Sequence, residues 1–219
     1  MYLLCWSAKG GVGTTVVAAA LAVVSARSGP TVLVDIGGDA PAALGIEAPT
    51  GPGLGDWWAS PHAPADALLS LATPVRDGLR FVHAGTMPSV LSPLHAERLA
   101  VAAARHDTTV VIDAGSAVPH EILHRCADAS LLVIRPCYLA IRRAVVHAGL
   151  ATGIVVVTEP GRALGATDIA NTLGAPVVAQ VPWDPAVARA VDSGSLAGRV
   201  PPALARPVSR IASTVRVVR

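Results

Sequence analysis

Lysine is almost absent from this chain: Lys9 is the only one, and every other long basic side chain among its 17 Lys+Arg is arginine. With 15 acidic residues, the formal net charge at pH 7 is only +2. That balance gives no electrostatic reason of its own to expect nucleic-acid binding. The single amine is the first place to look for chemistry, because a slim point charge enters a phosphate cavity that the planar arginine fork does not.

Aromatic residues are also scarce, at 3% of the chain, whereas apolar residues make up 52% and charged residues only 15%. So apolar a composition argues against disorder. With so few aromatic rings, the core must be built mainly from alanine, valine and leucine. The length of 219 residues suits one α/β domain with an ample core.

Cysteine is limited to Cys5, Cys126 and Cys137, and their odd number and wide spacing argue against a disulfide framework or a metal cluster. We expect free thiols in a reducing cytoplasm. No basic segment followed by an apolar core opens the sequence, so no signal peptide is expected. The apolar run 16–24 is too short to cross a bilayer. The expected location is cytoplasmic.

The lone lysine stands in a glycine-rich turn, Ala8-Lys9-Gly10-Gly11-Val12-Gly13-Thr14-Thr15. An apolar run at 2–6 predicts a buried strand before this turn, and 15–27 predicts a helix after it. Glycines let the backbone approach phosphate oxygens, and amides at a helix start hold such anions. The candidate phosphate-binding residues are Lys9, Gly10, Gly11, Val12, Gly13, Thr14 and Thr15, with the Thr15 hydroxyl directed to Mg²⁺.

The turn departs from the general P-loop pattern at two positions, where Ala8 replaces the first glycine and Thr14 replaces the lysine. The stretch from Lys9 to Thr15 instead resembles the deviant Walker A motif of the ParA/MinD family. The resemblance implies ATP and Mg²⁺ as cofactors, and a homodimer in which Lys9 reaches the partner's nucleotide. The loss of lysine at position 14 resembles the CpaE/TadZ branch, whose members act in the localisation of pilus assembly.

The fold expected is a single-domain, doubly wound α/β structure with a mostly parallel sheet and helices on both faces, as in P-loop NTPases. Near-continuous apolar runs alternate with helical stretches, which is typical of strands covered on both sides. The expected strands are 2–6, 31–35, 79–83, 108–113, 130–135, 153–158 and 176–181. Segment 47–78 reads as loops with short helices at 54–59 and 65–72. Within it, Trp57-Trp58 is interpreted as a hydrophobic plug, with an exposed contact as the alternative.

Carboxylates follow two of these strands. Asp35 and Asp113 each end a strand, so both are expected at the edge where ligands gather. Together with Thr15 they are the candidate Mg²⁺ ligands, Asp113 resembling a Walker B aspartate; helix capping is the alternative for it. The resemblance places a water-orienting aspartate at Gly37, where it is missing. Asp39 lies two residues further on, and Lys9 and Asp39 are the candidate catalytic residues.

Segment 181–184 resembles the family loop beside the nucleotide base, which makes Pro182 and Asp184 further cofactor-binding candidates. Thr158 stands where the family usually has a base-reading asparagine, so base selectivity stays open. His120 and His124 have helical spacing but lack a third ligand, and an ordinary helix face is favoured over a metal site. Arg142 and Arg143 are either a partner-binding surface or an exposed helix face.

The family resemblance covers 1–198, and 199–219 forms a basic C-terminal helix or tail. Its apolar stripe comprises Leu204, Val208, Ile211, Val215 and Val218. Prolines at 201, 202 and 207 limit how early a regular helix can begin. Packing on the domain is favoured; peripheral contact of 203–219 with the inner face of the membrane and DNA binding are the alternatives.

The function expected is an ATP-binding protein with weak or no hydrolysis, because positions 14 and 37 both lack groups used in phosphoryl transfer. Its nucleotide-linked dimer would position a partner machinery for pili or secretion, for a cell pole or for division. A slow true ATPase cycling on membrane or nucleoid DNA is the alternative. A nucleotide-free scaffold is the second alternative.

Overall fold

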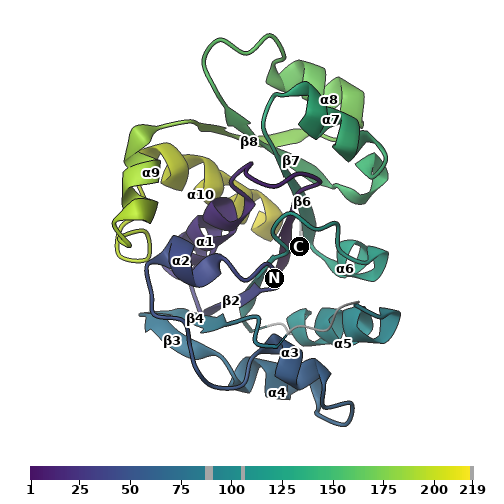
Figure 1. The fold of residues 1–219 in the computed structure, drawn as a ribbon, viewed down its shortest axis with the longest axis vertical. Coiled ribbons are helices and arrows are strands. Elements are labelled where there is room, and N and C mark those ends of the chain that lie inside the picture. The colour runs from purple at the N-terminus through teal and green to yellow at the C-terminus, as the bar shows by residue number, and fades with distance from the viewer. Residues whose placement is uncertain (87–90, 105–106, 218–219) are drawn as a thin grey trace.

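The computed structural model describes residues 1–86, 91–104 and 107–217. One eight-stranded sheet runs through the molecule in the order β3-β4-β2-β5-β1-β6-β7-β8, and helices lie on both of its faces (Figure 1). All neighbouring strands are parallel except β3 and β4. The strands are β1 (Tyr2–Trp6), β2 (Thr31–Asp35), β3 (Thr73–Arg76), β4 (Leu79–Val82), β5 (Thr109–Asp113), β6 (Ala129–Ile134), β7 (Gly153–Thr158) and β8 (Val177–Pro182).

Two apolar cores cover the two faces of this sheet, because successive side chains of a strand point to opposite sides. In β1, Leu3 and Cys5 join one core, and Tyr2, Leu4 and Trp6 join the other. The first core is shared with α1 (Thr14–Ser25), α2 (Ala40–Leu44), α9 (Pro185–Asp192) and α10 (Pro202–Val217). The second is shared with α3 (Leu54–Trp58), α4 (Ala65–Ser70), α5 (Pro93–Ala103), α6 (Glu121–Cys126), α7 (Tyr138–Val145) and α8 (Ala166–Leu173), and the short helix η1 (Ala148–Leu150) follows α7.

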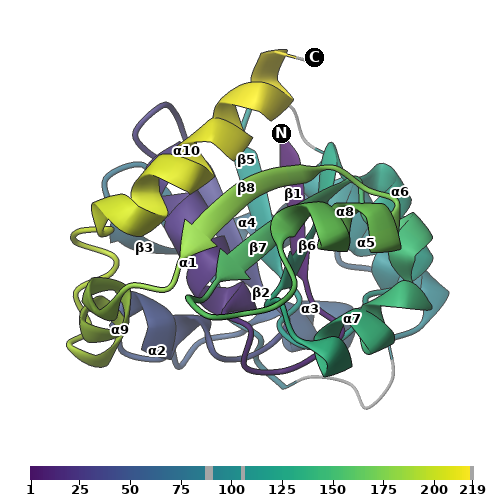
Figure 2. The ribbon, with the colours of Figure 1, turned by 90° about the horizontal axis from the view of Figure 1, so that it is seen from above.

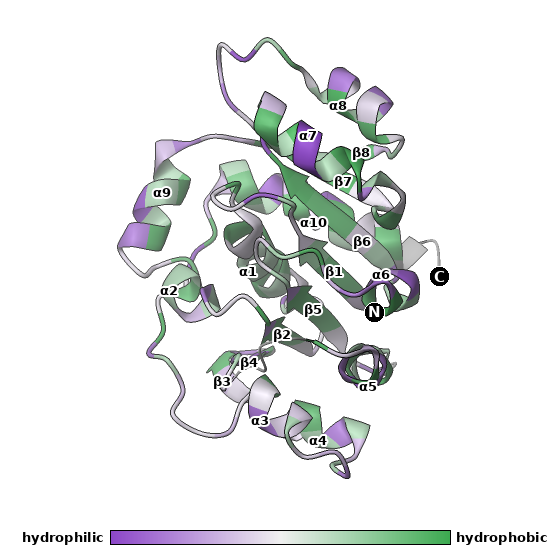
Figure 3. Cartoon of the chain, turned by 45° about the vertical axis from the view of Figure 1, so that its right-hand side comes forward, coloured by the Kyte–Doolittle hydropathy of each residue, from purple (hydrophilic) through white to green (hydrophobic). Residues whose placement is uncertain are grey.

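The hydropathy colouring follows these layers: the strands and α1 are mostly hydrophobic, and α7 carries strongly hydrophilic positions (Figure 3). The α/β class, the parallel sheet and the seven expected strands are confirmed, three at the expected bounds and four with ends shifted by one residue. The run 16–24 lies in α1, whose residues from Val17 to Ser25 are all buried. Among the described residues no helix is both long and apolar enough to cross a bilayer.

Segment 47–78 holds one element that the sequence did not predict. The edge strand β3 pairs antiparallel with β4, although Pro74 lies within it. An edge strand tolerates proline, since only one side of it carries ladder hydrogen bonds. The two short helices are confirmed as α3 and α4. Trp57 and Trp58 are each 3% exposed, so the plug interpretation is confirmed.

The C-terminal helix begins earlier than expected. Helix α10 starts at Pro202 and continues through Pro207, so the prolines do not delay it. A proline at the start of a helix loses no hydrogen bond, because the first amides have no partner within the helix. Leu204, Val208 and Ile211 are buried in the first core, and Figure 2 shows α10 lying along β8 and over α1. The favoured packing interpretation is confirmed; Val218 lies outside the described residues.

Candidate functional site

The glycine-rich turn joins β1 to α1 at the carboxyl edge of the sheet. Gly11 and Gly13 have φ angles of 75° and 96°, a left-handed conformation that glycine adopts readily. Gly13 is the N-cap residue of α1 and offers no side chain to its first amides, and the first turn carries no acidic residue. The positive end of the helix is therefore open to an anion. The Ser7 hydroxyl donates to the Lys9 carbonyl at 2.9 Å, which holds the turn in shape.

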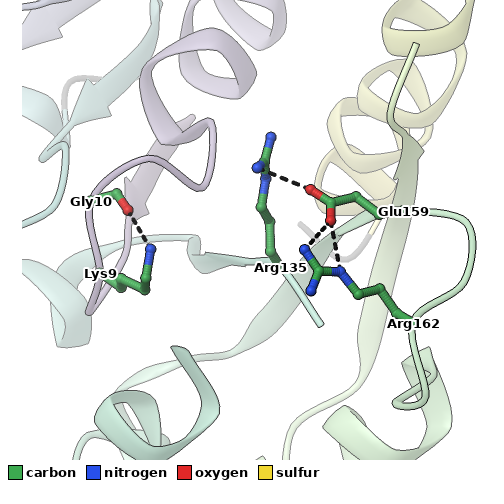
Figure 4. Close-up of polar contacts among 5 residues, drawn as sticks. All are labelled: Lys9, Gly10, Arg135, Glu159 and Arg162. Atoms are coloured by element: carbon green, nitrogen blue, oxygen red, sulfur yellow. Dashed lines mark hydrogen bonds and ion pairs between the residues drawn. The ribbon is translucent and has the colours of Figure 1, made fainter. Parts of the chain in front are cut away.

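A cavity of about 360 Å³ opens over this turn. It brings together the turn, the start of α1, the end of β5 and helix α2, although these segments lie far apart in the sequence. Of the predicted residues, Gly10, Gly11, Gly13, Thr14, Thr15 and Asp39 line it. The other predicted residues do not: Val12, Pro182 and Asp184 line a neighbouring cavity, Asp35 lines a third, and Lys9 and Asp113 line none of the three. The Lys9 amine donates to the Gly10 carbonyl at 3.0 Å (Figure 4).

Asp35 and Asp113 lie side by side at the ends of β2 and β5. Both are fully buried. The Asp113 Oδ1 atom accepts a hydrogen bond from the Gly115 amide at 2.9 Å, whereas its Oδ2 atom is buried with no hydrogen-bond partner among the described residues. A buried carboxylate oxygen without a partner, next to the hydroxyl of Thr15, suits a hard cation such as Mg²⁺ or one of its bound waters.

The carboxylate of Asp35 holds the turn that follows β2. Its Oδ1 atom accepts from the Gly38 amide at 2.7 Å and its Oδ2 atom accepts from the Ala40 amide at 3.0 Å. Burial raises the pKa of Asp35, and the two amides oppose that rise. Asp35 therefore shapes the wall of the cavity, which places Asp39 at its rim as the exposed N-cap residue of α2.

Position 37, where the family resemblance places a water-orienting aspartate, lies close to the backbone of Gly115. A Cβ atom at this position would lie 3.2 Å from the Gly115 Cα atom and 3.4 Å from the Gly115 amide nitrogen. The Ile36 and Gly37 amides both point to the Asp113 carbonyl, at 2.8 and 3.3 Å, and draw the two loops together. Sequence reasoning missed this contact, for which the glycines at 37 and 115 were the available signal.

A second cavity of about 210 Å³ adjoins the first, and both are lined by Gly13, Val16 and Val191. Pro182 and Asp184 line it, together with Trp183, which is 51% exposed. The Asp184 Oδ1 atom accepts from the Ala186 amide at 2.7 Å and caps α9. The other residues that line this second cavity include Val12, Arg135, Val157 and Val181. The cavity is mostly apolar, as expected of a pocket for a ring.

The remaining candidates lie away from these cavities. His120 caps α6, and the His124 ring contacts the Ser130 hydroxyl at 2.8 Å. His124 is only 4% exposed and its ring packs edge-on against Trp6, so the interpretation as an ordinary helix face is wrong for this residue. No group of three metal-binding side chains occurs in the described part of the chain. Arg142 and Arg143 are exposed on α7. Cys5 is buried, Cys126 exposed and Cys137 half-buried, all as free thiols.

The pKa of Asp113 makes a testable difference to stability. Burial raises it to about 6, the Gly115 amide opposes the rise, and Asp35 adds to it. An unfolded aspartate has a pKa of about 3.9. The folded protein thus holds more protons than the unfolded chain between about pH 4 and pH 6, so this group's contribution to stability is lost as the pH rises through that window. His124 acts oppositely: burial lowers its pKa to about 4, so its contribution is lost as the pH falls.

We therefore expect Asp113→Asn to raise the melting temperature of the ligand-free protein by several degrees near pH 7.5. The gain in melting temperature over the unmutated protein should shrink to nothing towards pH 4, because the protonated Asp113 side chain is then neutral, as the asparagine of the variant is at every pH. Thermal melts in a chelating buffer at several pH values measure this difference, in which the His124 effect cancels. Asp77→Asn is the control, because Asp77 is exposed and is not among the groups that act on the Asp113 carboxylate. A constant difference at all pH values would contradict the assignment.

Comparison with known proteins agrees with this geometry. No curated protein sequence matches the chain. Among solved structures, a ParA family ATPase from Chlorobium tepidum TLS has a TM-score of 0.73 at 20% identity, covering 96% of this chain and 98% of its own. A MinC:MinD cell division complex from Aquifex aeolicus gives 0.72 at 20% identity, with coverages of 99% and 96%.

The septum site-determining protein MinD from Pyrococcus horikoshii OT3, complexed with Mg-ADP, gives a TM-score of 0.73 at 18% identity, with coverages of 99% and 96%. These similarities show the fold. The model of the CobQ/CobB/MinD/ParA nucleotide-binding domain matches residues 3–197, which is most of the chain. The chain belongs to the CobQ/CobB/MinD/ParA nucleotide-binding family.

Proposed function

We propose that this protein binds ATP with Mg²⁺, hydrolyses it weakly or not at all, and uses the bound nucleotide to form a dimer that positions a partner machinery. One observation carries the proposal: the glycine-rich turn and the start of α1 leave amides open to a phosphate, whereas two groups used in cleavage are absent. These groups are a lysine at position 14 and a carboxylate at position 37. The absence of a lysine at position 14 supports a relation to the CpaE/TadZ-like branch. The proposed partner is a pilus or secretion assembly, a polar complex or a division complex. The proposed location of the protein is the cytoplasm.

Support for binding comes from the backbone. The left-handed glycines of the turn and the uncapped start of α1 offer amides to phosphate oxygens. The Asp113 Oδ2 atom, which has no hydrogen-bond partner among the described residues, supports a magnesium ion near Thr15. Mg-ADP in the similar MinD from Pyrococcus horikoshii OT3 supports this class of ligand. Magnesium would neutralise phosphate charge there, and the chain's own residues orient the phosphate groups.

Support for weak hydrolysis comes from positions 14 and 37. Phosphoryl transfer depends on placed positive charge and an oriented water. Thr14 provides no charge, and Gly37 provides no carboxylate at a position where a Cβ atom would already lie 3.2 Å from the Gly115 Cα atom. Lys9 remains, but in the monomer its amine is bonded to its own loop. Two deficits in one cavity favour a binder over a fast enzyme.

Lys9 is proposed to complete the site of a second copy. Its bond to the Gly10 carbonyl lies at the surface of the loop, so the amine can leave it at little cost. Lys9→Ala is expected to abolish ATP-dependent dimerisation while leaving the monomer fold unchanged. Light scattering coupled to gel filtration, with and without ATP and Mg²⁺, measures this. Arg27→Ala, at the far end of α1, is the control. A dimer of Lys9→Ala that still requires ATP would contradict the role.

The partner surface is proposed on α7. Arg142 and Arg143 are exposed there beside Tyr138, which is 73% exposed. A MinD protein of Aquifex aeolicus occurs in complex with MinC, which supports a protein partner for this fold. The apolar stripe of α10 is buried, whereas Arg206 and Arg210 of this helix are open to an anionic surface. Membrane contact through 203–219 and DNA binding therefore remain secondary proposals.

The test of the proposal is equilibrium ATP binding with Mg²⁺, measured beside steady-state turnover. Binding at cellular ATP concentrations with negligible phosphate release is the expected result. No binding at millimolar ATP would overturn the proposal and favour the nucleotide-free scaffold. Turnover as fast as that of an intact family member, lost in Lys9→Ala, would overturn the non-hydrolysing part.

A slow true ATPase is the second candidate, and Asp39 is the observation that favours it. Its carboxylate is exposed, makes no capping hydrogen bond and lines the cavity of the glycine-rich turn. Asp39 with Lys9 would then carry part of the missing catalysis. Single-turnover hydrolysis with added vesicles or DNA separates this candidate from the first, and loss of that stimulated rate in Asp39→Asn would assign the residue.

A further inference from the structure

Arg135 occupies a position that neither the motif nor the fold explains. It follows β6, the strand next to β1, so it stands at the same carboxyl edge as the glycine-rich turn. Its side chain lines the apolar cavity together with Val12 and Gly13 of that turn. Figure 4 shows it extending between the turn and the carboxylate of Glu159.

The guanidinium of Arg135 is only partly satisfied. One Nη atom pairs with Glu159 at 2.9 Å, while its Nε atom is buried with no hydrogen-bond partner among the described residues. Burying a donor without a partner is unfavourable, so such atoms call for a reason. The side chain as a whole is one-third exposed, so a ligand can reach it.

Charge points the same way. Glu159 also pairs with Arg162, whose Nε atom donates to it at 2.7 Å. Two guanidinium groups share one carboxylate, which leaves a local positive charge beside Arg135, although the carboxylates of Asp184 and Asp192 also line this cavity. The adjoining start of α1 adds the partial positive charge of a helix N-terminus with no acidic residue in its first turn. The three features together attract an anion.

We propose that Arg135 is a nucleotide-binding residue that contacts the phosphate chain and supplies a positive charge that Thr14 lacks. The two cavities meet around Gly13 and Val16, so a nucleotide spanning them passes its phosphates beside Arg135. Glu159 and Arg162 hold the guanidinium ready at that crossing. This inference rests on the proposed ATP binding and adds to it a residue outside the glycine-rich turn.

The test is equilibrium binding of ATP, AMP and adenosine to Arg135→Gln, followed by calorimetry. A charge-assisted hydrogen bond is lost, so ATP and AMP affinities should fall by about 10-fold or more, and adenosine affinity should not change. Arg135→Lys should keep part of the affinity, because it keeps the charge. Arg162→Gln is the matched control: it removes the same charge from the same cluster but does not line the cavity, and its effect should stay within about twofold.

The outcomes separate this inference from the proposed function. ATP binding that is equal in Arg135→Gln and the unmutated protein would overturn the role of Arg135 and leave the proposed function standing. An equal loss for adenosine would also overturn it, since the contact would then be to the base or the sugar. Absence of ATP binding by the unmutated protein would overturn both. Far-ultraviolet circular dichroism and thermal melts establish that each variant is folded, and Arg135→Lys gives the same decision should Arg135→Gln fail to fold.

Discussion

Thr14→Lys is expected to raise the affinity for ATP by about 10- to 100-fold without producing fast hydrolysis. Thr14 is the first residue of α1 and lines the cavity over the glycine-rich turn, so a lysine at this position has space into which to extend. A hydrogen bond from an ammonium to a phosphate is charge-assisted and is worth about 1.5–3 kcal/mol. That energy corresponds to the stated gain in affinity.

Hydrolysis should stay slow because the second deficit remains. Position 37 still carries no carboxylate, and a Cβ atom there would lie 3.2 Å from the Gly115 Cα atom. The comparison is made with Thr14→Gln, which has a long polar side chain without charge and should gain little affinity. Calorimetry gives the affinities, and phosphate release under saturating ATP gives the rate. Fast turnover by Thr14→Lys would show that a missing charge alone silenced the site, and the proposal of two deficits would be wrong.

The sequence predicted the parts of the fold whose signal is local. Strands buried on both faces have continuous apolar runs, so β1, β5 and β7 were found from their residues alone. Strand β3 was missed because it lies at the sheet edge, alternates between half-buried and exposed positions, and contains Pro74. An edge strand is formed by its partner β4, and no local pattern reports that pairing.

The residues of the candidate site also differ in whether a local sequence pattern predicts them. The turn from Lys9 to Thr15 carries its own conformational signal in its glycines, and the structure brings most of it to one cavity. The contact of Gly37 with Gly115 was missed, because the two glycines indicate small residues but not that the neighbouring strands β2 and β5 bring their following loops together. Arg135 was not predictable either, because its place beside the turn follows from the strand order β1-β6, which the sequence does not state.

Gly45→Ala is the substitution expected to destabilise the fold most. Gly45 ends α2 with a φ of 72°, a left-handed conformation in which alanine costs about 1 kcal/mol. A Cβ atom there would lie 2.1 Å from the Gly194 carbonyl oxygen and 2.2 Å from the Gly194 Cα atom. Both are backbone atoms and cannot rotate away, so α2 and the end of α9 must move apart. Overpacking of this kind adds about 1–3 kcal/mol.

Gly174→Ala separates the two contributions. Gly174 ends α8 with a φ of 65°, but a Cβ atom there meets nothing within 4 Å. It carries the strain without the clash, so its loss of stability should be near 1 kcal/mol, against about 2–4 kcal/mol for Gly45→Ala. Urea unfolding of both variants measures the difference. Equal losses of stability in the two variants would mean that α2 and the end of α9 move apart at little cost in free energy.

Gly45→Ala should also weaken nucleotide binding. Helix α2 carries Asp39 and α9 carries Val191, and both residues line the cavity over the glycine-rich turn. The contact of Gly45 with Gly194 joins these two walls, and the amide of Ala197 adds a bond to the Leu44 carbonyl at 3.2 Å. Separating the helices at this point widens the cavity that phosphate must fill. Gly174→Ala leaves both walls in place, so a loss of ATP affinity in Gly45→Ala alone would trace the effect to the joint between α2 and α9.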